Sequence, residues 1–378
     1  MRIALGIFLI ILMSFISGLL LGQKIELFPS DQLLSPLVKQ IKKPKELPLL
    51  KYSFNNLPEY QFQASELKIE KTLEETADYT SYLFSYTTTE QKMTGVVNVP
   101  SQALDANQPL PVVILIRGWV PAASYYPGLG SKNAAAVFAK NGYVTFAPDF
   151  FGYGQSDPEP SNSWEARFIK PINVIELIYT IQNQRKLTLP NQPMKKPDSQ
   201  HLALAPDKLK IWAHSNGGQI ALSVLEILSQ PIPTTLWAPV TAPFPYSVLF
   251  FSDEHDDEGK EMRKWLSLLE ADYDVFEFSI TQHLDKLNAP LQIHHGTADE
   301  AALKTWSDEF VSKLKKENQR RQQTKQALLS TDSAQLNTQI LAPIKINYYS
   351  YAGANHNLQP NNNWDLAIQR DLKFFSQY

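Results

Sequence analysis

Residues 210–222 read KIWAHSNGGQIAL and place a single serine, Ser215, between an apolar run and two glycines. The residues before Ser215 are typical of a buried strand, and the residues after it have the pattern of a helix. Ala213, Gly217 and Gly218 are small, as a sharp strand-to-helix turn requires, because such a turn brings the two elements close together. The stretch therefore predicts a strand–turn–helix unit with the Ser215 hydroxyl exposed at the turn. The alternative is an ordinary helix with Ser215 as its N-cap.

The segments around this unit alternate between strands and helices. Predicted strands cover 92–100, 111–118, 143–149, 209–214, 234–239, 290–296 and 344–353, and predicted helices cover 133–142, 162–184, 215–229, 302–316 and 363–377. The run PVVILIRG is apolar almost throughout, as expected of a strand that is buried on both faces of a parallel sheet. The alternation predicts an α/β fold with a doubly wound, mostly parallel sheet in one domain at 61–378.

Two stretches interrupt the alternation. Residues 240–287 contain FPYSVLFF, an acidic cluster and an amphipathic segment. This connection is long, so we expect it to form a lid over a site, and it is called the lid below. Residues 317–342 are polar and rich in glutamine, and we expect them to form a mobile surface insertion.

The N-terminus has a different character. Residues 3–22 form an uncharged apolar run, and about 20 such residues can span a bilayer. Because Gly22 and Lys24 flank a poor cleavage site, we expect a transmembrane signal anchor at 1–22, with a cleaved signal peptide as the alternative. Residues 23–60 would then be a linker, and the main domain would lie outside the cytoplasm.

Composition excludes several classes of function. The chain has 35 basic and 38 acidic residues, and this balance does not suggest a nucleic-acid partner. It contains no cysteine, which excludes disulfides, thiolate catalysis and cysteine metal sites. The sequence does not specify an oligomeric state.

Partners for Ser215 follow two later strands. A serine hydroxyl needs a base to take its proton, and the base needs a group that orients it. Asp299 follows the strand at 290–296, and His356 follows the strand at 344–353. Carboxyl ends of parallel strands collect catalytic groups at one edge of the sheet. We therefore expect a catalytic triad of Ser215, Asp299 and His356, with Glu300 as a rival for the acid.

An oxyanion would need two donors. We expect the backbone N–H of Asn216, next to the serine, and the N–H of Trp119, in the loop after the strand at 111–118. Arg117 has either a structural role or binds a substrate carboxylate. His214 should point away from the turn, whereas His294 and His295 should support the acid loop.

These residues resemble the α/β-hydrolase superfamily, and within it the catalytic domain of the prolyl oligopeptidase family. The similar stretches are RGW (117–119), PDFFGYGQSD (148–157), AHSNGG (213–218), HHGTADE (294–300) and YAGANH (351–356). The resemblance implies a serine hydrolase that cleaves peptide or ester bonds, without metal or organic cofactor.

The chain also departs from this pattern. Ile116 stands where these peptidases often have a tyrosine, and residues 301–302 are Ala-Ala rather than Val-Pro. A carboxylesterase of the acetyl xylan esterase or dienelactone hydrolase kind fits equally well. A non-catalytic binding protein with the same fold is the further alternative.

Overall fold

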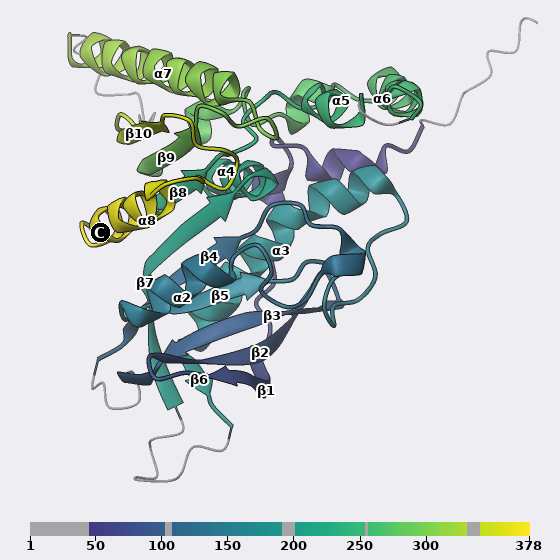
Figure 1. Cartoon of the computed structure of the whole chain (residues 1–378). Helices are drawn as coiled ribbons and strands as arrows, with labels where there is room; N and C mark the ends of the chain where they lie inside the picture. Colours follow the sequence, from purple (N-terminus) through teal and green to yellow (C-terminus); the bar gives the residue numbers. More distant parts are fainter. Residues whose placement is uncertain (1–44, 103–107, 191–200, 254–255, 331–340) are drawn as a thin grey trace, which may run out of the picture. The chain divides into compact units, whose positions relative to one another are not determined.

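The computed structural model describes residues 45–102, 108–190, 201–253, 256–330 and 341–378 (Figure 1). The chain divides into two compact units, Met1–Leu47 and Pro48–Tyr378. Residues 48–60, which the predicted linker includes, belong to the larger unit. The short helices η2 (Pro48–Tyr52) and η3 (Leu57–Glu59) belong to the larger unit, because their apolar residues Leu49, Tyr52 and Leu57 are buried in its core.

One large sheet organises the unit. Its strands are β1 (Lys68–Glu75), β2 (Tyr79–Thr88), β3 (Gln91–Pro100), β4 (Leu110–Ile116), β5 (Val144–Pro148), β6 (Lys186–Thr188), β7 (His201–His214), β8 (Thr234–Trp237), β9 (Leu291–Gly296) and β10 (Ile346–Tyr351). The order is β1-β2-β3-β5-β4-β7-β8-β9-β10, with β6 beside β7. Pairing is antiparallel from β1 to β5 and parallel from β5 to β10. The mostly parallel sheet is the predicted one.

Helices cover both faces of the sheet, and strand β4 shows why. The helices of one face are α2 (Lys132–Lys140) and α8 (Asn363–Phe375), and those of the other are α3 (Ser163–Gln184), α4 (Asn216–Leu228) and α7 (Lys304–Ser330). Along β4, Val113 and Leu115 pack with α2 and α8, whereas Val112, Ile114 and Ile116 pack with the α3–α4 side. Side chains alternate across a strand, so an unbroken apolar run fills two cores.

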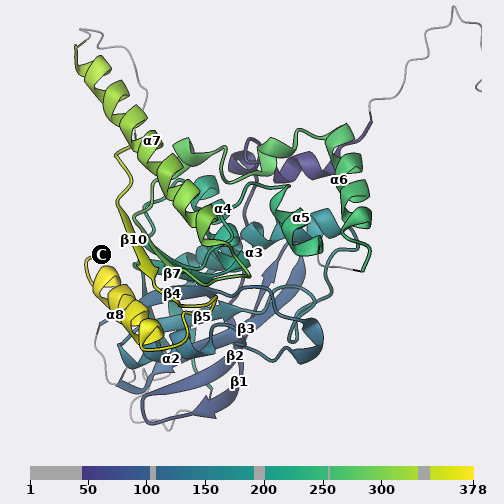
Figure 2. The same cartoon turned by 45° about the horizontal axis from the view of Figure 1, so that its top comes forward.

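The described residues of the lid, 240–253 and 256–287, form two α-helices and two short 3-10 helices. They are α5 (Ser247–Ser252), α6 (Lys260–Asp272), η6 (Val275–Phe278) and η7 (Leu284–Lys286), and Figure 2 shows α5 and α6 together near the N-terminal half of α3. The buried Phe244 makes edge contacts with the rings of Trp164 and Phe168, at centroid distances of 5.8 and 5.3 Å. Aromatic packing therefore holds the lid on the first turns of α3.

The predicted fold class needs one correction, because it included a transmembrane helix at 1–22. Among the described residues, no helix combines the length and the apolar character that a bilayer crossing requires. The long helices α3 and α7 carry charged residues along their length, which accounts for this result. Residues 1–22 themselves lie outside the described residues.

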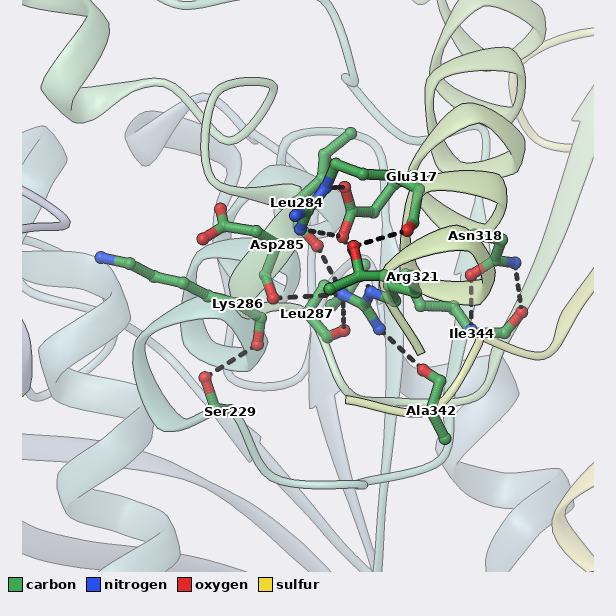
Figure 3. A network of polar contacts seen from close by, with 12 residues as sticks. Ser229, Leu284, Asp285, Lys286, Leu287, Glu317, Asn318, Arg321, Ala342 and Ile344 are labelled. Carbon is green, nitrogen blue, oxygen red and sulfur yellow. Dashed lines mark hydrogen bonds and ion pairs between the residues drawn. The ribbon is translucent and has the colours of Figure 1, made fainter. Parts of the chain in front are cut away.

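The polar segment at 317–342 also differs from its prediction. Helix α7 continues to Ser330, so the first half of this segment is helical, and residues 331–340 lie outside the described residues. Figure 3 shows the reason, which is a polar network around the buried Arg321. Its guanidinium donates to the carbonyls of Leu284, Asp285, Leu287 and Ala342 and pairs with Glu317 at 2.8 Å. Arg321 thus ties α7 to the end of the lid and to the segment before β10.

We predict that Arg321→Met destabilises the protein by about 3 kcal/mol, because it leaves several buried carbonyls without their donor and removes one of the two arginines that pair with Glu317. The urea midpoint of unfolding measures the loss. Arg320→Met is the matched control, since Arg320 pairs with the same Glu317 from a side chain that is 58% exposed. It should cost less than about 1 kcal/mol. Equal losses in both variants would show that the buried network does not anchor the helix.

Candidate active site

Ser215 lies at the turn between β7 and α4 with φ 57° and ψ −126°. A positive φ is costly for a residue with a side chain, and such strain is often kept at functional positions. The turn is held by hydrogen bonds from Ser215 N to the carbonyl of Trp237 at 2.9 Å and from Val240 N to the Ser215 carbonyl at 3.0 Å. The serine side chain caps no backbone N–H of α4. An ordinary N-cap therefore does not explain this residue.

The small residues around the turn are required by close packing. A Cβ at Gly217 would collide with the carbonyl oxygens of Ile116 and Arg117, and one at Gly218 would lie 2.5 Å from Cβ of Pro239. A Cβ at Gly118 would lie 3.3 Å from Ser215 Oγ. The loop after β4 therefore passes directly beside the serine hydroxyl, and glycine leaves the space in front of it open.

Asp299 and His356 lie together at the ends of the adjacent strands β9 and β10. His356 Nδ1 donates to Asp299 Oδ2 at 2.8 Å, and Oδ1 of the same carboxylate is 3.1 Å away. The Asp299 side chain is fully buried, whereas the His356 side chain is 21% exposed. With Nδ1 held by the carboxylate, the Nε2 atom remains as the proton acceptor of the ring.

The Asp299 carboxylate stays ionised in this environment. Burial alone would raise its pKa, but hydrogen bonds from His295, His356 and the backbone N–H of Ala302 hold the pKa well below its usual value. His295 Nε2 lies 3.2 Å from Oδ2, so it supports the acid loop as predicted. A fixed negative charge beside His356 can stabilise the ring when the ring accepts a proton.

Backbone hydrogen bonds join the two loops that carry this pair. Thr297 N donates to the carbonyl of Tyr351, Ala298 N donates to that of Ala354, and Gly353 N donates to Thr297 Oγ1 at 2.8 Å. A side chain at Gly296 would collide with the Ala354 carbonyl, so glycine permits this approach. The position of His356 thus depends on backbone contacts between segments about 57 residues apart.

His214 has a role that sequence analysis missed. It was expected to point away from the turn, but its ring lies 4.7 Å from the His356 ring, centroid to centroid. Its Nε2 is 3.0 Å from the His356 carbonyl oxygen, so the neutral ring donates this hydrogen bond. Because His214 directly precedes Ser215, the contact brings the histidine loop to the serine turn. The position before the serine at a strand end was the signal available in the sequence.

Burial and the neighbouring His356 lower the pKa of His214 to about 4. An unfolded histidine has a pKa of about 6.5. Below that pH, His214 therefore binds a proton in the unfolded chain but stays neutral in the folded chain. The contribution of neutral His214 is complete above pH 6.5 and is lost as the pH falls to about 4, a decrease of about 3 kcal/mol.

His214→Gln should remove most of this pH dependence while keeping an N–H donor near the His356 carbonyl. The measurement is the free energy of unfolding in urea at several values between pH 7 and 4.5. The wild type should lose about 2 kcal/mol more than the variant over this range. His283, whose pKa burial also lowers, titrates in both proteins and cancels in the difference. Parallel curves would contradict a folded protein in which His214 is partly buried and neutral.

Arg117 shapes the loop beside the serine. The buried guanidinium donates to the carbonyls of Gly118 at 2.9 Å and Asp149 at 2.7 Å. It lies over the rings of Tyr125 and Tyr153, at 4.6 and 4.1 Å from their centroids. These contacts favour the structural role among the two that the sequence left open, because the guanidinium is buried in a cage of its own chain.

Two further residues complete the predicted site. The Trp119 side chain is 72% exposed, and its backbone N–H belongs to the peptide unit whose carbonyl Arg117 holds. In a trans peptide the N–H points opposite to the C=O, so the Trp119 N–H points away from Arg117. Asn216 is the first residue of α4, where backbone N–H groups have no intrahelical acceptor.

The structure does not join all three predicted catalytic residues. Across the described ranges, no hydrogen bond links Ser215 Oγ to His356. Such nucleophile–base bonds are often long before a substrate binds. No group of three or more His, Asp or Glu side chains in the described residues could hold a metal ion.

No known family profile and no curated protein matches this chain. Solved structures do match. The acetyl xylan esterase from Paenibacillus sp. R4 is 12% identical with a TM-score of 0.57, over 93% of this chain and 100% of that chain. Acetyl xylan esterase 1 from Thermoanaerobacterium sp. JW/SL YS485 is 11% identical with a TM-score of 0.56, over 86% and 93%.

A peptidase is also among the similar structures. Dipeptidyl peptidase 4 of Porphyromonas gingivalis is 15% identical with a TM-score of 0.50, over 84% of this chain but 36% of that chain. The chain therefore has the fold of the α/β-hydrolases, as its resemblance to that superfamily predicted.

Proposed function

We propose that this protein is a serine hydrolase that cleaves acyl esters through Ser215, His356 and Asp299. The observation that carries the proposal is the pair of the buried Asp299 and the partly exposed His356, 2.8 Å apart, at the sheet edge where the strained Ser215 turn also lies. A histidine oriented by an ionised carboxylate beside a strained, uncapped serine is the arrangement that makes a hydroxyl nucleophilic.

The reaction follows from these positions. Ser215 Oγ attacks the substrate carbonyl, and His356 Nε2 takes the hydroxyl proton while Asp299 stabilises the resulting imidazolium. The N–H groups of Asn216 and Trp119 donate to the oxyanion that forms on the carbonyl oxygen. The imidazolium then protonates the leaving group, and a water, activated by the same histidine, releases the acid from the acyl-enzyme.

We propose ester hydrolysis rather than peptide hydrolysis because of the coverage of the similar structures. The two acetyl xylan esterases align over nearly their whole length, whereas the dipeptidyl peptidase aligns over 36% of its chain. Peptide hydrolysis is the second candidate, supported by that same peptidase.

A fluorophosphonate probe tests the proposal, since it reacts with serines that a neighbouring base activates. We expect stoichiometric labelling of wild-type protein, located on the Ser215 peptide by mass spectrometry. Labelling should be lost in Ser215→Ala and strongly slowed in His356→Ala. Absence of labelling, or labelling that persists in Ser215→Ala, would favour the non-catalytic binding protein. A panel of short acyl esters and aminoacyl anilides then separates esterase from peptidase.

A further inference from the structure

Arg167 lies where α3, α4 and the lid meet. Its Nη2 donates to Oε1 of Gln219 at 2.7 Å, and its Cζ lies 5.5 Å from the centroid of the Phe244 ring. Gln219 is four residues after Ser215, which is about one turn along α4. Phe244 belongs to the lid. The guanidinium therefore contacts a side chain that lies about one helical turn after the serine, and it also contacts an aromatic ring of the lid.

The partners of Arg167 are all uncharged. Within the described residues, no carboxylate lies within 4.0 Å of its guanidinium. The two acidic residues nearest to it in sequence are engaged elsewhere. Glu165 accepts from the Tyr52 hydroxyl at 2.6 Å and pairs with Lys51, and Glu159 pairs with Lys170 at 3.2 Å. The charge of Arg167 is thus not balanced by the protein.

The surroundings make an unbalanced charge costly. Burial lowers the pKa of Arg167 to about 10, and no acidic neighbour opposes this effect. The guanidinium still carries its charge at neutral pH. The charges of Arg167 and Arg117 both lower the pKa of Lys170, so both guanidinium groups lie within electrostatic reach of Lys170. A charge that is partly withdrawn from water is ordinarily paired, and a planar guanidinium is suited to bind a carboxylate with two hydrogen bonds.

Arg167 also has free donors. Its Nε and Nη1 atoms make no hydrogen bond to any described residue, and the side chain is only partly buried. A carboxylate on a bound molecule could therefore approach these atoms without displacing Gln219. The lid residue Phe244 would form one wall of such a site.

We propose that Arg167 binds a carboxylate of the substrate, so that the preferred substrates are esters whose acyl or leaving group is itself an acid. This inference rests on the proposed function, because it assigns the substrate class to the same site. Arg167 is then a specificity residue that contacts the substrate and does not take part in proton transfer. A neutral ester would leave the guanidinium without an anionic partner beside Phe244.

Matched ester pairs test the proposal on the full chain. In the first pair, mono-4-nitrophenyl adipate carries a carboxylate on its acyl group, and 4-nitrophenyl hexanoate has an uncharged acyl group of the same length. In the second pair, 3-acetoxybenzoate carries a carboxylate on its phenol leaving group, and phenyl acetate has an uncharged leaving group. In at least one pair, kcat/KM of the wild type should be about 10- to 100-fold higher for the acid, the range for a hydrogen bond to a charged group.

Substitutions at Arg167 and Lys170 test whether Arg167 causes the preference for acidic esters. Arg167→Gln should lower kcat/KM for the acidic ester by about the same factor and leave the neutral ester within about twofold. Arg167→Lys should keep part of the preference. Lys170→Gln is the matched control, since it removes one nearby charge that Glu159 already balances, and it should change the preference less than threefold. Equal kcat/KM within both pairs, or a loss shared equally by acidic and neutral esters, would overturn the proposal.

A binding experiment distinguishes failure of the hydrolase proposal from failure of the carboxylate site. If wild-type protein hydrolyses none of the esters, titration calorimetry with adipate and benzoate still decides the role of Arg167. Binding that disappears in Arg167→Gln and persists in Lys170→Gln supports an acid site without catalysis. Absence of binding to wild-type protein then overturns the carboxylate site as well.

Discussion

Ser215→Ala is expected to lower kcat for a 4-nitrophenyl ester by at least about 10³-fold, because it removes the atom that forms the acyl-enzyme. Any remaining rate would come from binding and from the oxyanion donors. His356→Ala should cause a loss of similar size, and the double variant should be little worse than either single one. Residues that act as a unit show this lack of additivity. Initial rates at saturating substrate are the measurement.

Stability separates a catalytic serine from a structural one. Ser215 has a φ of 57° and its hydroxyl caps nothing, so alanine at this position removes no internal hydrogen bond. Ser215→Ala should therefore unfold within about 0.5 kcal/mol of the wild type. Ser215→Gly should be more stable by about 1 kcal/mol, because glycine relieves the positive φ. Hydrolysis by Ser215→Ala at near the wild-type rate would refute the nucleophile.

Asp299→Asn is expected to lower kcat by about 10²- to 10⁴-fold through the tautomer of His356. Oδ1 of Asp299 accepts from the N–H groups of Ala301 and Ala302, which fixes the amide oxygen of the variant at that position. The amide nitrogen must then take the place of Oδ2, where it faces the nitrogens of His356 and His295. Because an amide donates where the carboxylate accepted, His356 would present N–H rather than a lone pair to Ser215.

Glu300 provides the matched control for this variant. It is the neighbouring acid that the sequence offered as a rival, and its side chain is exposed. Glu300→Gln should keep kcat within about twofold, since it contacts neither histidine. The decisive measurement is kcat against pH for both variants and the wild type. If Glu300→Gln caused the larger loss, the acid would have to be reassigned.

Local patterns made the strand–turn–helix at Ser215 predictable. An apolar run followed by small residues permits few other arrangements, since Gly217 and Gly218 occupy places where a Cβ would collide. The same reasoning placed Asp299 and His356 after consecutive parallel strands. Composition was a weaker guide, because polarity marked residues 317–330 as an insertion although a buried arginine fixes them as helix. The spanning helix predicted at 1–22 has no counterpart among the described residues.

By itself the sequence determined the α/β class, the alternation of the main strands and helices from β3 onward, and the loops on which the candidate residues lie, because these depend on periodicity and on residue size. Only the tertiary structure decided which side chains meet. The contact of His214 with His356 joins residues 142 positions apart, and the encounter of Arg167 with Gln219 joins residues 52 apart. Such contacts depend on how helices pack over the sheet, and charge balance at a site appears only once every neighbour is in place.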